Sequence, residues 1–164
     1  MHDRIQGIKD LKIMKLAEAL LLRSDLQTKL ASLQQRINNN ILVQEGDQPS
    51  EDPNLLIKEA FIVNKELHEL IQRIHATNAQ AKSIEGKSLL FVLNQRDFLT
   101  QQHRILQQAI DSSRRENGRY SSSEIRWIKT ISVADLQKQA DEMSKQLRQN
   151  NLEIQASNWQ VDLI

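Results

Sequence analysis

The chain has 164 residues and a formal net charge of +1, so no overall field attracts it to nucleic acid or to an anionic membrane. Hydrophobic residues make up 39% and aromatic residues only 4%, which is typical of long helices that bury a narrow apolar stripe. The absence of cysteine excludes disulfides, thiolate catalysis and zinc sites built on cysteine.

Apolar residues at helical spacing predict a first helix from Leu16 to Ile37, which ends in the three asparagines 38–40. The next segment, 41–53, holds a short β-prone run, turn residues, four acidic residues and no basic residue. We therefore expect an acidic connector after the first helix.

The second helix has a clear start signal, because Asp52 can cap it and Pro53 suits its first position. Leu55, Ile62 and Ile71 widen its apolar face, so we expect this helix to contact more than one neighbour. Its main seam alternates spacings of four and three, as in a coiled coil, on Leu56, Ala60, Val63, Leu67, Leu70 and Ile74.

A third helix is predicted to follow Ser88, and a fourth to follow Ser132, which forms a capping-box pattern with Asp135. The tail 157–164 is expected to pack across the end of the bundle. The third helix places Leu89, Val92, Leu99, Leu106 and Ile110 on one stripe, and the fourth places Val133, Leu136, Ala140, Met143, Leu147 and Ile154 on another.

Three polar residues interrupt these stripes: Arg96, His103 and Asn150. A charge in a dry seam costs several kcal/mol unless it is paired, so Arg96 is expected either to meet a carboxylate or to leave the seam through a hydrated gap. The candidates are Glu59, Glu66 or an acid on a second subunit. We interpret the three residues as determinants of register and oligomer state; the alternative is a functional polar cavity.

Together these patterns predict an all-α fold, namely an elongated antiparallel helical bundle or coiled-coil hairpins of four main helices. The narrow stripes would leave apolar surface exposed on a monomer, so we expect a homo-oligomer.

His68 and His75 lie seven residues apart, but neither stands in a Glu-x-x-His or His-Glu-x-x-His motif. No Walker loop, nucleophile elbow or dinucleotide-binding motif is present, so we expect no metal, no cofactor, no small-molecule substrate and no enzymatic activity.

The segment 112–129 combines basic and aromatic side chains and is a candidate interaction corner. Nucleic acid could be held there by phosphate contacts and base stacking. The alternative that we favour is a two-stranded β-ribbon at one end of the bundle, with Leu42–Glu45 antiparallel to Trp127–Ser132 and acidic residues facing basic ones. The corner comprises Arg114, Arg115, Arg119, Tyr120, Arg126, Trp127 and Lys129.

From Met14 onward, six stretches carry a resemblance to a known family: MKLAEALLLRSDLQTKLASLQQRI, VQEGDQPSEDP, HATN, QRDFL, RYSSSEIRWIKTISVADLQKQAD and NW at 158–159. With these stretches the chain resembles the septicolysin-like family of small bacterial helical proteins. The resemblance implies a single helical domain over residues 14–164, with residues 1–13 as an extension outside the family pattern. It implies no enzymatic activity, while the haemolysin label in the family name implies a membrane-active alternative.

The first 23 residues contain no apolar segment long enough for a secretory signal, and no apolar run approaches the roughly 20 residues that span a bilayer. We therefore expect a soluble cytoplasmic protein. The leading hypothesis is a homo-oligomeric interaction or scaffold protein without catalytic activity. The alternatives are a membrane-active, haemolysin-like protein and a weak nucleic-acid binder that uses the 112–129 corner.

Overall fold

The computed structural model describes residues 14–113 and 128–164, which form four α-helices. These are α1 (Leu16–Asn40), α2 (Pro53–Gln80), α3 (Leu89–Ser113) and α4 (Val133–Gln160). The prediction of an all-α fold with four main helices is confirmed.

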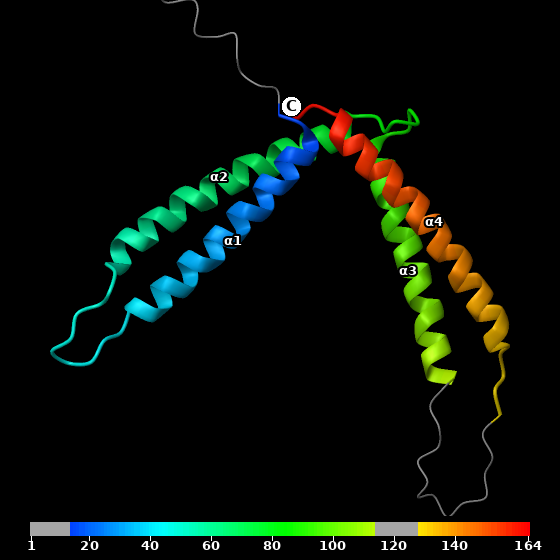
Figure 1. The fold of residues 1–164 in the computed structure, drawn as a ribbon, viewed down its shortest axis with the longest axis horizontal. Coiled ribbons are helices and arrows are strands. Elements are labelled where there is room, and N and C mark those ends of the chain that lie inside the picture. Colours follow the sequence, from blue (N-terminus) through cyan, green and yellow to red (C-terminus); the bar gives the residue numbers. More distant parts are fainter. Residues whose placement is uncertain (1–13, 114–127) are drawn as a thin grey trace, which may run out of the picture.

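The helices pack in two antiparallel pairs, which we call the α1–α2 arm and the α3–α4 arm. Figure 1 shows the two arms diverging from a common apex, where the C-terminus lies. The start of α1, the end of α2, the start of α3 and the end of α4 all meet at this apex. Each arm is therefore only two helices thick over most of its length.

Local capping signals define where α2 and α4 begin. The Asp52 side chain accepts a hydrogen bond from the Asn54 backbone N–H at 2.8 Å, and Pro53 occupies the first helical position. The Ser132 hydroxyl accepts one from the Asp135 backbone N–H at 3.3 Å. Each side chain satisfies a backbone donor that would otherwise lack a partner in the first turn. Both predicted caps are confirmed.

The apolar core is divided into three clusters rather than being continuous. One cluster joins Leu33 of α1 to the outer half of α2, and another joins Ile110 of α3 to the outer half of α4. The third lies at the apex and draws residues from α1, α2, α3 and the tail. The predicted seam of α2 is confirmed, because all six of its residues are buried: Leu56, Ala60, Val63, Leu67, Leu70 and Ile74.

The last residues of the chain tie the apex together. The Leu16 N–H donates to the Val161 carbonyl at 2.9 Å, and the Leu163 N–H donates to the Met14 carbonyl at 2.8 Å. The Ile164 N–H donates to the Thr77 hydroxyl at 3.0 Å. The tail thus joins α1 to α2. The prediction that it packs across one end of the helices is confirmed for residues 161–164, whereas residues 157–160 belong to α4 and Trp159 is 56% exposed.

The predicted β-ribbon does not form between the described residues. Residues 41–52 connect α1 to α2 at the outer end of the α1–α2 arm, whereas 128–132 lead into α4 at the outer end of the α3–α4 arm. The two segments lie far apart in Figure 1, and neither is a strand over its described part. The ribbon required both segments at the same end of the molecule, and the divergence of the arms separates them.

The acidic connector 41–52 is anchored to α1 instead. The Arg36 guanidinium binds the Glu51 carboxylate through Nε at 2.9 Å and also through Nη2. Asn40 adds a second anchor, since its Oδ1 accepts from the Glu51 backbone N–H at 3.0 Å while its Nδ2 donates to the Arg36 carbonyl. The connector therefore folds back against the last turn of α1.

This anchor predicts a pH dependence. The hydrogen bond from Arg36 lowers the pKa of the Glu51 carboxyl below its usual value. A carboxyl whose pKa is lower in the folded state adds stability above its unfolded pKa of about 4.3, and this stability is lost as the pH falls through the folded pKa. Glu51→Gln should therefore reduce the free energy of unfolding modestly at pH 7, because the pair is partly exposed, and the difference from the unmodified protein should shrink as the pH falls below about 4.3.

Urea unfolding at pH 7, 4 and 3 measures this difference. Glu45→Gln, at an exposed position in the same connector, is the matched control and should change the free energy of unfolding little at pH 7. A Glu51→Gln effect that is the same at pH 3 and pH 7 would contradict an ionic origin.

Candidate interaction surfaces

Each arm exposes large apolar side chains, since two helices alone can cover only one side of each other. On α2, Phe61 and Ile62 in the middle of the helix are 70% and 67% exposed, and Leu55 is exposed near its start. The prediction that this helix contacts more than one neighbour is confirmed, because α2 packs against α1 and also meets α3 at the apex. Leu55 and Ile62 do not take part, since both face solvent in the single chain. Their exposure leaves the α1–α2 arm with unpartnered apolar surface.

On α3, exposed apolar residues recur every seven positions. Phe91, Phe98 and Ile105 are each more than half exposed. A spacing of seven residues returns to nearly the same side of a helix after two turns, so the three side chains lie along one line. We use the name α3 stripe for this line together with its intervening residues, namely Phe91, Gln95, Phe98, Gln102, Ile105 and Ala109.

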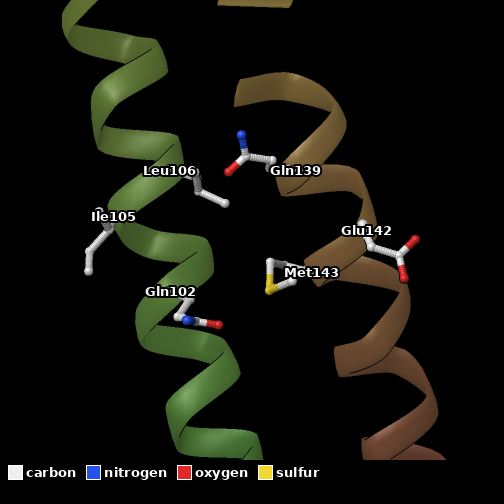
Figure 2. Close-up of a pocket in the computed structure, with 6 residues that line it drawn as sticks. All are labelled: Gln102, Ile105, Leu106, Gln139, Glu142 and Met143. Carbon is white, nitrogen blue, oxygen red and sulfur yellow. The ribbon is translucent and has the colours of Figure 1, made fainter. Parts of the chain in front are cut away.

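A hollow of about 360 Å³ lies between α3 and α4 beside the α3 stripe. Figure 2 shows Leu106 of α3 and Met143 of α4 pointing toward each other between the helices. Ile105 points away from α4, and Glu142 points away from α3. The hollow therefore has an apolar floor, with a charged group only at its margin among its six lining residues: Gln102, Ile105, Leu106, Gln139, Glu142 and Met143.

The three polar seam residues behave differently from one another. Arg96 binds the carboxylate of its neighbour Asp97 through Nε at 3.0 Å and Nη2 at 2.8 Å, so the predicted pairing with Glu59 or Glu66 is wrong. Glu59 instead pairs with Lys29 of α1 at 3.1 Å. Arg96 is partly exposed and reaches a carboxylate on its own helix, because α2 diverges from α3 beyond the apex.

His103 and Asn150 remain within the α3–α4 arm. His103 Nε2 lies 3.0 Å from the Ser144 hydroxyl, which joins the two helices halfway along the arm. At that distance a serine nucleophile could be activated by a histidine base. Such a histidine is usually oriented by a third group, but among the described residues no carboxylate is bonded to the other ring nitrogen of His103. Asn150 Oδ1 is buried and has no hydrogen-bond partner in the described part of the chain.

Sequence reasoning missed a buried carboxylate at the apex. Glu153 of α4 is only 7% exposed, and it accepts a hydrogen bond from the Ser83 hydroxyl at 2.5 Å. Lys87 Nζ lies 3.4 Å from its other oxygen. The Ile84 N–H donates to the Ser157 hydroxyl at 3.0 Å, one turn further along α4. These bonds attach the α2–α3 connector, 81–88, to α4.

No sequence signal indicates this site, because Ser83 and Lys87 are 70 and 66 residues away from Glu153 along the chain. Gly86 in the connector has a φ of +80°, a conformation that glycine adopts easily, and its N–H donates to the Ser83 carbonyl. The tight turn presents Ser83 to α4.

The basic corner falls largely outside the described residues, which include Lys129 but not Arg114, Arg115, Arg119, Tyr120, Arg126 or Trp127. Lys129 is exposed in the segment that leads into α4. A nucleic-acid site in this corner stays a prediction.

His68 and His75 are both exposed, and Gln72 Nε2 lies 3.1 Å from His68 Nε2.

Within residues 14–113 and 128–164, no three His, Asp or Glu side chains are grouped so that they could hold a metal ion. Over the same residues, no helix is both long and apolar enough to cross a bilayer.

The fold and its surfaces define an all-α protein with two diverging helical arms, each with exposed apolar side chains. The chain belongs to the family of unknown function DUF6847, whose family model matches residues 23–163. It is also similar to a functionally unknown conserved protein from Corynebacterium diphtheriae, for which a crystal structure exists. The two chains share 34% sequence identity with a TM-score of 0.84, over 92% of this chain and 99% of the other. A search of the curated proteins found no match.

Proposed function

We propose that this protein is a cytoplasmic homo-oligomeric interaction or scaffold protein without catalytic activity, built on arms that pack internally as coiled-coil hairpins. The exposed apolar surface of both arms carries the proposal. Phe61 and Ile62 on one arm, and Phe98 and Ile105 on the other, are all more than half exposed. Contiguous apolar patches on soluble proteins mark interaction sites, because covering them stabilises an assembly by about 25 cal/mol per Å².

The shape of the chain supports the same proposal. A helix hairpin buries one stripe of each helix and leaves the opposite stripes to water, whereas a bundle of four helices covers more of each. Since the arms diverge, they do not cover each other along their length. Residues 14–113 and 128–164 supply no further cover for either arm, so a second molecule is our proposed source of it.

The mass in solution tests this proposal. Light scattering of the purified protein at tens of micromolar should give at least twice the mass of the 19.0 kDa chain. A strict monomer would refute the proposed homo-oligomer. The membrane-active alternative implied by the septicolysin-like resemblance predicts dye release from liposomes at micromolar protein, which a scaffold protein should not cause.

A further inference from the structure

We propose that two copies of the chain associate through their α3–α4 arms about a two-fold axis, with the α3 stripe at the centre of the interface. The inference rests on the homo-oligomer proposed above and specifies the surface and the partner. Three observations carry it: the period of the stripe, the absence of charge on it, and the hollow beside it.

The α3 stripe has the period of a second coiled-coil seam. Its residues alternate spacings of four and three from Phe91 to Ala109. Each of them directly precedes a residue of the seam that faces α4, so the stripe lies about 100° around the helix from that seam. A helix with two adjacent seams is suited to contact two neighbours. Within the chain, α4 covers one seam, and the other faces solvent.

The stripe carries no charge, although 26% of the chain is charged. The four neighbours of Phe98 one turn before and after it all have amide side chains. The four neighbours of Ile105 are three residues with amide side chains and one alanine. Together these neighbours are Asn94, Gln95, Gln101, Gln102, Gln108 and Ala109. Across a two-fold axis a surface meets itself, so a charge near the axis would face an identical charge. Amide side chains both donate and accept hydrogen bonds and can pair with themselves.

The exposed apolar residues of α2 lack this property. Phe61 has Lys58 and Lys65 as its neighbours one turn away. All four neighbours of Ile62 one turn away are charged, namely Lys58, Glu59, Lys65 and Glu66. A contact centred on either residue would remove these charged groups from water, a cost that the amide neighbours of Phe98 avoid. The comparison favours the α3–α4 arm as the self-association surface.

The hollow between α3 and α4 gives the partner a place to insert side chains. Its floor of Leu106 and Met143 is apolar, and Gln102 of the α3 stripe is among its lining residues. From Phe91 to Ala109, α3 is about 27 Å long, and two helices side by side are about 20 Å wide. Covering this face on both copies removes on the order of 1,100 Å² from water, enough for a specific interface.

The test compares two matched phenylalanine variants of the full chain. Phe98→Glu places a charge at the centre of the proposed interface and should convert the oligomer to a monomer at 50 µM, or raise its dissociation constant about thirtyfold or more, as expected for a central aromatic residue. Phe61→Glu makes the same change in the middle of α2 and should leave the mass unchanged. Both residues are exposed, so both variants should keep the helical content seen by circular dichroism.

Because the chain has no cysteine, a second measurement can locate the contact even if a variant folds poorly. Gln102→Cys should give a covalent dimer with a short bismaleimide, whereas Lys65→Cys should not. An oligomeric protein whose mass survives Phe98→Glu, or which cross-links through residue 65 and not 102, would overturn this surface and leave the homo-oligomer intact. A monomeric unmodified protein would overturn both proposals.

Discussion

Replacing Ile74 by alanine is expected to lower the free energy of unfolding by about 2–5 kcal/mol, the range for large-to-small changes in a packed core. Ile74 is 1% exposed and belongs to the apical cluster. This cluster connects the two arms, so a cavity there weakens the joint as well as α2. Its buried members are Leu16, Ala19, Leu70, Ile74, Leu89 and Leu163.

Urea unfolding followed by circular dichroism measures this loss, with Ile62→Ala as the matched control. Ile62 is on the same helix but 67% exposed, so the same chemical change should shift the free energy of unfolding by no more than about 0.5 kcal/mol. Equal losses in the two variants would show that the apex is no better packed than the outer face of α2. If Ile62 lies in an interface, its loss should depend on protein concentration, which separates the two explanations.

Glu153→Ala should be the most destabilising replacement of a charged residue among those in the described helices. It removes the acceptor of the Ser83 hydroxyl, and Ser83 is buried, so an unsatisfied hydroxyl costs about 1–3 kcal/mol. The same change releases the 81–88 connector from this point on α4. We therefore expect both a lower free energy of unfolding and a wider range of angles between the arms, measured by small-angle X-ray scattering.

Two further variants separate the roles of charge and hydrogen bonding at this site. Glu153→Gln keeps an acceptor for Ser83 and should lose less stability than Glu153→Ala. Glu69→Ala, at an exposed position on α2, should be nearly neutral. A neutral Glu153→Ala, or a scattering curve identical to that of the unmodified protein, would show that the connector is held by packing alone.

The sequence alone was sufficient to place the four helices and to identify the buried seam of α2. Asp52 with Pro53 and Ser132 with Asp135 mark helix starts through hydrogen bonds that reach no more than three residues along the chain. The seams of α2 and α3 were found because apolar residues must recur at the helical period to reach a common neighbour. These features depend on local geometry, which is why a single sequence is enough to predict them.

The tertiary structure decided which surfaces and charges meet. Leu55 and Ile62 have the spacing of buried residues, but both are exposed because the arms diverge. The spacing of apolar residues along the chain does not indicate this divergence. Glu51 pairs with Arg36 at the outer end of its own arm, whereas the described residues 128–132 lie at the outer end of the other arm. Glu153 is buried because a connector about 70 residues earlier folds onto α4. The spacing of hydrophobic residues indicates which side of a helix is suited to burial, but the path of the whole chain determines what buries it.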